Sequence, residues 1–271
     1  MTDDRRLPTE EWLLDAANFP GGHAAEIVFP RTIADVVDVL TTSASVMPVG
    51  AQSSLTGGAT PMGETILATT KMNRVIDIEP GLITVEPGVT IAAMQERLTE
   101  AGAWFPPAPT FTGAFAGGIV ATNAAGAATF KYGSTRDWVE ALTVVLADGT
   151  VLDVRRGTQR AGHGGFEIET ASGRVAVPVP TYRMPNVAKR SAGYHAAPGM
   201  DLIDLFIGSE GTLGVITQIS FRTLSPAPNI VLAWIPCADE AQGLTLVQAL
   251  RDASIETRRT GAAAGLDACA I

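Results

Sequence analysis

Three glycine-rich segments constrain this fold more than any other feature of the sequence. They lie at residues 48–58, 109–126 and 208–217, each beside a run of apolar residues. Glycine adopts backbone conformations that other residues avoid, and it lets another group approach the backbone closely. We therefore expect loops that either pack tightly against their neighbours or lie against a flat or charged ligand.

The apolar pattern between these segments predicts a mixture of helices and strands. Thr32 and Asp35 form a capping pattern at the start of a helix over residues 32–44. Thr90 is the expected N-cap of a second helix, which ends at Gly102. Short apolar stretches predict strands at 46–49, 65–69, 75–78, 82–86, 139–147, 151–154 and 215–224. This mixture indicates α+β organisation.

The second half of the sequence adds turns and a boundary. Asp148-Gly149 is a hairpin turn, and Ser172-Gly173 is the expected turn between strands at 166–169 and 174–177. A short helix is expected at 202–206. The proline-containing stretch 225–228 is typical of a domain boundary. Beyond it we expect one strand and one helix, at residues 230–235 and about 239–253.

Charge and composition exclude several classes of protein. The formal net charge is −9 and the arginines are scattered, so we expect no nucleic-acid partner. Cys237 and Cys269 lack metal-ligand spacing, as do His23, His163 and His195, so no metal is expected. No apolar run is long enough for a membrane span, and no secretory signal is evident. A cytoplasmic location is therefore expected.

The first glycine-rich segment follows a predicted strand, as phosphate-binding loops often do. Its small residues would let consecutive N–H groups and hydroxyls contact a phosphate without any lysine; an ordinary surface loop is the alternative. Residues 58–65 have P-loop spacing, but Glu64 occupies the lysine position, so we reject a nucleoside-triphosphatase. The sequence has no G-x-G-x-x-G after a strand and no G-x-S-x-G, which argues against a Rossmann site and a hydrolase.

The other two segments also have two interpretations each. Residues 109–126 carry almost no bulky side chain in their second half, so a helix there can lie against a ring system or pack tightly on another element. Residues 208–217 connect a helix to a strand, and the turn is either structural or open to a ligand on one side. Glu210 is expected to accept hydrogen bonds from neighbouring N–H groups.

Six stretches in this order resemble one family. They are PVGAQSSLTGG (48–58), ITVEPGVT (83–90), FAGGIVATNAAG (115–126), KYGSTRDWV (131–139), LTVVLADGTVL (142–152) and DLIDLFIGSEGTLGVIT (201–217). The chain resembles the FAD-linked oxidases with a PCMH-type FAD-binding domain, in particular the group of D-lactate dehydrogenase and the glycolate oxidase FAD subunit.

The resemblance implies an α+β fold with a PCMH-type FAD-binding domain at 1–225, made of two α+β subdomains at about 1–105 and 106–225. Residues 226–271 would be the incomplete start of an α+β substrate cap. The implied cofactor is FAD, and the residues implied to contact it are Pro48, Gly50, Ala51, Gln52, Ser53, Ser54, Pro109, Gly117, Gly118, Thr122, Asn123, Gly214 and Ile216. We expect non-covalent FAD, because no His or Cys lies between Val46 and Phe130.

The implied activity is oxidation of a small 2-hydroxy acid, of the D-lactate or glycolate type, by hydride transfer to the flavin. The sequence departs from the family at Ala51-Gln52-Ser53 and Phe115-Ala116, which leaves the role of Gln52 open. It also lacks the His-rich motif of the cap, so no catalytic base is implied. Two alternatives remain: an alkyldihydroxyacetonephosphate synthase-like flavoenzyme, and a flavin-binding fragment without turnover that needs a partner chain or associates with itself.

Overall fold

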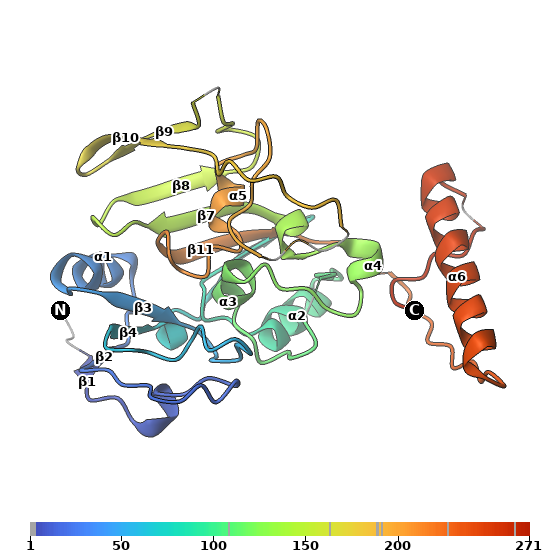
Figure 1. Cartoon of the computed structure of the whole chain (residues 1–271), viewed down its shortest axis with the longest axis horizontal. Coiled ribbons are helices and arrows are strands. Elements are labelled where there is room, and N and C mark those ends of the chain that lie inside the picture. The colour runs from blue at the N-terminus through green and yellow to red at the C-terminus, as the bar shows by residue number, and fades with distance from the viewer. Residues whose placement is uncertain are drawn as a thin grey trace.

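The computed structural model describes residues 4–107, 109–162, 164–187, 190, 192–226, 228–262 and 264–271. Two sheets and the helices between them form the body of the molecule, and one long C-terminal helix lies to its side (Figure 1). Within these residues, the search for a helix of sufficient length and apolarity to cross a membrane found none. His163, whose role was considered above, falls outside the described residues.

The first sheet has four strands in the order β1-β2-β4-β3. They are β1 (Arg5–Arg6), β2 (Ile27–Val28), β3 (Val46–Val49) and β4 (Thr65–Ala68), and β4 runs parallel to both β2 and β3. Helix α1 (Ile33–Thr42) connects β2 to β3 and begins with the predicted capping box of Thr32 and Asp35. Its Val36 and Val39 are buried against the first sheet, and they form a hydrophobic core with residues of that sheet.

The second sheet is antiparallel, with five strands in the order β5-β6-β11-β7-β8. They are β5 (Val75–Glu79), β6 (Leu82–Val85), β7 (Val139–Val145), β8 (Val151–Arg155) and β11 (Val215–Arg222). Helices α2 (Ile91–Glu100) and α3 (Ala116–Ala121) contribute to its core. There the rings of Phe105 and Phe221 lie 4.8 Å apart and are fully buried.

Several shorter elements and the long C-terminal helix complete the described chain. The shorter elements are η1 (Glu10–Trp12), η2 (Thr69–Lys71), α4 (Thr129–Tyr132), η3 (Thr135–Trp138), β9 (Phe166–Thr170), β10 (Gly173–Val177) and α5 (Ile203–Phe206), and the long helix is α6 (Glu240–Thr260). Strands β9 and β10 pair as the predicted hairpin. Figure 1 shows α3 in the middle of the body, between the two sheets.

The predicted α+β class is confirmed, and so are the predicted helices and strands up to residue 224, within one to two residues at most ends. The strand predicted at 230–235 is wrong. That stretch is extended but joins no sheet among the described residues, because no neighbouring strand lies beside it to bind its N–H and C=O groups. The subdomain boundary at residue 105 stays a prediction; β5 and β6 precede it, yet they share a sheet with β7, β8 and β11.

Candidate functional site

The three glycine-rich segments, far apart in the sequence, meet in the structure. A Cβ atom placed on Gly211 would lie 2.6 Å from Cγ of Pro48, so the third segment packs directly on the start of the first. A Cβ atom on Gly50 would lie 3.6 Å from the side chain of Phe115, the N-cap of α3. The first segment therefore contacts both of the others.

Apart from Leu55, which is 79% exposed, small and polar residues form the surface of the first segment. Ser53 is exposed, and Ala51 and Ser54 are half-buried. The hydroxyls of Ser54 and Thr56 lie 3.1 Å apart, and the Thr56 N–H donates to Ser54 Oγ at 3.3 Å. These hydroxyls and the adjacent backbone are donors of the kind that hold a phosphate without a lysine.

Helix α3 presents two different sides. A Cβ atom on Gly117 would lie 2.7 Å from Cβ of Pro87, so this glycine is required for packing. The first two N–H groups of the helix, from Ala116 and Gly117, donate to the carbonyls of Val89 and Pro87 at 2.8 Å each. They are therefore engaged within the protein, and an anion would have to use other donors.

The opposite side of α3 is open. A Cβ atom on Gly118 would meet nothing within 4 Å. Thr122, one turn later, is exposed and donates its hydroxyl to the Gly118 carbonyl at 2.9 Å. Pro109 is half-buried. An open surface of small residues on this helix fits a flat cofactor with a phosphate group, and a Cβ atom at Gly118 would intrude on it.

Asn123 fixes the end of α3. It is 2% exposed and has a φ of 47°, in the left-handed region that asparagine tolerates better than most residues. Its Oδ1 accepts the Arg136 N–H at 2.9 Å, and its Nδ2 donates to the Arg190 carbonyl at 3.2 Å. Asn123 therefore acts here through hydrogen bonds within the protein, and contact with a cofactor stays a prediction.

An ionic cluster that includes Arg136, the hydrogen-bond partner of Asn123, is largely buried. The guanidinium groups of Arg136 and Arg156 both bind the carboxylate of Asp204, at 3.1 and 3.2 Å. Burial lowers the pKa of Arg136, while Asp204 acts in the opposite direction. Burial, followed by the positive charge of Arg136, also lowers the pKa of His195, so this half-buried ring is neutral at pH 7. No local pattern in the sequence predicts this cluster, since its members come from three distant segments.

Ile216 lies in β11 of the second sheet, and Gly214 directly precedes that strand. Gly214 has a φ of 149°, and a Cβ atom there would lie 2.8 Å from both Val144 Cγ1 and Val145 O. Ile216 pairs with Val144 in β7 and is 8% exposed. Both residues have a clear packing role, and their predicted contact with the cofactor through the backbone stays a prediction.

Glu210 has a different arrangement from the one expected. Its φ is 53°, and its N–H donates to the Ala121 carbonyl at 2.8 Å, which connects the third segment to α3. In the described part of the chain its carboxylate accepts no hydrogen bond, so the predicted role as an acceptor for nearby N–H groups is not observed. The carboxylate instead lies beside Gly58, with Oε2 at 3.5 Å from a Cβ atom placed there.

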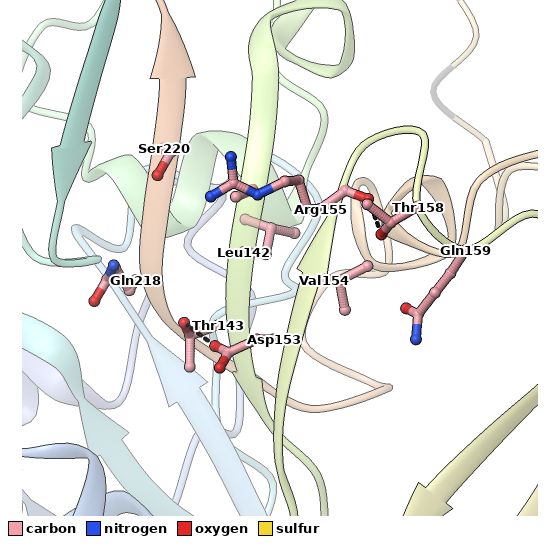
Figure 2. Close-up of a pocket in the computed structure, with 10 residues that line it drawn as sticks. Leu142, Thr143, Asp153, Val154, Arg155, Thr158, Gln159, Gln218 and Ser220 are labelled. Carbon is pink, nitrogen blue, oxygen red and sulfur yellow. Dashed lines mark hydrogen bonds between the residues drawn. The ribbon is translucent and has the colours of Figure 1, made fainter. Parts of the chain in front are cut away.

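A hollow of about 480 Å³ lies elsewhere, on the other face of the second sheet (Figure 2). Gln218 and Ser220 from β11, Thr143 from β7, and Asp153 and Arg155 from β8 line it. Thr143 donates to Asp153 at 2.7 Å. None of the residues that line the hollow belongs to the three glycine-rich segments, so it is separate from the candidate site.

The described residues bring no three His, Cys, Asp or Glu side chains together as metal ligands.

Comparison with known proteins supports the same assignment. Residues 24–155 match the model of the FAD binding domain family. D-lactate dehydrogenase of Anaerostipes hadrus is 35% identical over 193 residues, covering 70% of this chain and 33% of that protein. Mitochondrial D-2-hydroxyglutarate dehydrogenase of Bos taurus is 32% identical over 261 residues, covering 93% of this chain and 41% of that protein.

A solved structure of alkyldihydroxyacetonephosphate synthase superposes with a TM-score of 0.59 at 18% identity, covering 85% of this chain and 38% of that one. At this identity the likeness concerns the fold alone. The chain spans between a third and about two fifths of the length of these relatives. Residues 24–155 are therefore assigned as a FAD-binding domain of the PCMH type, similar to that of the FAD-linked oxidases, and its cofactor is FAD.

Proposed function

We propose that this chain supplies the FAD-binding part of a dehydrogenase that oxidises a small D-2-hydroxy acid. The observation that carries the proposal is the contact of residues 48–58, through Gly50, with Phe115 at the start of α3, the helix whose Gly118 and Thr122 leave a surface of small residues open. The names of the relatives, D-lactate dehydrogenase and D-2-hydroxyglutarate dehydrogenase, support the substrate class.

In this proposal, the residues of this chain bind the cofactor and orient it. The backbone of Gly50 to Ser54 donates to the pyrophosphate, and Gly118 and Thr122 border the cofactor on α3. When bound, FAD supplies an acceptor for the hydride of the substrate C–H bond. We assign no proton-transfer residue to this chain, and the base that receives the hydroxyl proton is not among the residues proposed here.

An absorption spectrum of the purified protein tests the cofactor, and anaerobic addition of D-lactate, D-2-hydroxyglutarate and glycolate tests the substrate class. We expect a yellow protein, or apoprotein that takes up FAD, whose flavin is reduced by dithionite. Fast reduction by a D-2-hydroxy acid would show that this chain suffices for turnover. Reduction by dithionite alone would favour a cofactor-binding part that needs further residues. A protein that takes up no FAD would contradict the proposal.

The FAD is expected to be non-covalent, because the matched cofactor segments contain no His or Cys. Acid precipitation should release the yellow colour into the supernatant, and colour that stays with the pellet would contradict this expectation. We also propose a cytoplasmic location, although the names of several relatives include "mitochondrial"; fractionation of the source cells tests it.

A further inference from the structure

A buried carboxylate near the N-terminus is attached to the first glycine-rich segment. Asp15 follows η1 and is 4% exposed. Its Oδ1 accepts the Ala17 N–H at 3.0 Å, and its Oδ2 accepts the Ala59 N–H at 3.3 Å. Among the described residues no cation pairs with it. A buried carboxylate is costly unless it is hydrogen-bonded, so these N–H groups largely determine where Asp15 lies.

Gln52 provides a second attachment to the same stretch. Its side-chain amide donates to the Leu14 carbonyl at 2.7 Å, and its own carbonyl accepts the Ala16 N–H at 2.9 Å. Its φ of 51° lies in the left-handed region, which is unusual for glutamine. The side chain that the sequence left without a role is therefore a clamp that holds the backbone in this conformation.

A third contact involves an aromatic ring. Gly57 has a φ of 80°, and a Cβ atom there would lie 3.0 Å from the ring of Phe19. Residues 52, 57 and 59 are thus all held by residues 14–19. The stretch from residue 52 to residue 59 includes Ser53 and Ser54, which the proposed function assigns to the pyrophosphate.

We propose that Asp15 and Gln52 are positioning residues for FAD, which hold the first segment in its binding conformation before the cofactor arrives. This inference rests on the proposed function of that segment. A glycine-rich loop loses much conformational entropy when it becomes ordered around a ligand. A loop that is already held loses less on binding, and its affinity is correspondingly higher.

The test compares Asp15→Asn and Gln52→Ala with Asp35→Asn. Asp35 is a matched control, because its carboxylate also accepts two backbone N–H groups, from Arg31 and Thr32 at 3.0 Å each, but lies on α1. FAD affinity of the apoproteins is measured by fluorescence titration, their stability by urea unfolding, and protection of residues 52–60 by amide hydrogen exchange.

We expect the Asp15 and Gln52 variants to bind FAD about tenfold more weakly, because loss of one hydrogen bond that orders the loop is of this size. Exchange at residues 52–60 should be faster in their apoproteins. Asp35→Asn should lose stability while it keeps its FAD affinity and its protection at 52–60. The change in loop protection separates positioning from a general loss of stability.

Two results would overturn the inference. In the first, the wild-type protein binds FAD, and the FAD affinities of Asp15→Asn and Gln52→Ala equal that of Asp35→Asn. The other is unchanged affinity and protection in Gln52→Ala, which decides the matter if Asp15→Asn does not fold. Wild-type apoprotein that binds no FAD would instead contradict the proposed function, and the inference with it.

Discussion

The body of the molecule and its C-terminal segment, residues 228–271, use similar apolar residues in opposite ways. In the body, Ile83, Phe105 and Phe221 are fully buried. In the C-terminal segment, Val231, Leu232 and Trp234 are 88%, 91% and 93% exposed. Apolar residues form a core only where a second element covers them, and the extended stretch 230–235 has no such element among the described residues.

The attachment of the C-terminal segment is mainly polar. Arg258 on α6 donates to the Phe130 carbonyl at 2.8 Å and its guanidinium lies 4.4 Å from the centre of that ring. Lys131 pairs with Asp267 at 2.5 Å. Such partly exposed contacts contribute little each, on the order of 1 kcal/mol or less. We therefore expect the body to determine stability and cofactor binding, and the C-terminal segment to determine association.

The largest expected difference is in stability. Phe221→Ala should lower the free energy of unfolding by about 3–5 kcal/mol, because it removes a buried ring that packs on Phe105. Trp234→Ala should change it by about 0.5 kcal/mol or less, since that side chain is exposed. Urea unfolding measures both. Similar losses in the two variants would mean that Trp234 is covered in solution, and the contrast between the regions would fail.

The next difference lies within the body, between two glycines. Gly50→Val should weaken FAD binding by at least about tenfold, equivalent to about 1.4 kcal/mol, because a branched side chain beside Phe115 would shift the backbone of the proposed phosphate site. The Cβ atom itself would meet Phe115 at an ordinary 3.6 Å, and the two further methyl groups of valine would press on that ring.

Gly149→Ala is the control. Its φ is 83° and an added Cβ would lie 2.8 Å from Thr41 Cγ2, so we expect a loss of stability of about 1 kcal/mol or more. Its FAD affinity should stay at the wild-type value. Equal FAD affinities in two folded variants would argue against the phosphate-binding role of residues 50–54.

Association should depend on the C-terminal segment. Replacing Val231, Leu232 and Trp234 together by Ser removes the most exposed apolar side chains of the chain, and the variant should elute as a monomer at concentrations where the wild type forms larger species. Gel filtration with light scattering measures this. A wild-type protein that is monomeric at the highest concentration tested would show that the exposed stretch does not drive association.

The smallest expected effect concerns pH. The folded-state pKa of His195 is lowered by burial and by Arg136, so the unfolded chain binds the proton more readily. The stability from this neutral ring is fully present above the unfolded pKa of about 6.5 and declines as pH falls below it. Urea unfolding at pH 7.5 and 5.5 should show a smaller decline in His195→Gln than in wild type, with the exposed His23→Gln as control. Equal declines in all three proteins would contradict the assignment.

Local signals in the sequence were sufficient for most of the helices and strands up to residue 224 and for the resemblance to a family. Thr32 with Asp35, and Thr90, marked the helix starts because a capping side chain binds N–H groups two or three residues away. The glycines of residues 48–58 and 208–217 indicated close backbone approach, and Gly211 beside Pro48 shows where one such approach occurs. These features depend on neighbours in the chain, so the sequence alone determines them.

Only the tertiary structure decided how distant residues act together. Asp15 reaches Ala59, and Gln52 reaches Leu14, through hydrogen bonds across 44 and 38 positions of the chain, respectively. The strand predicted at 230–235 failed for the complementary reason. Its apolar residues satisfy the local pattern of a strand, but a strand also needs a neighbour whose N–H and C=O groups bind its own, and only the folded chain determines whether one is there.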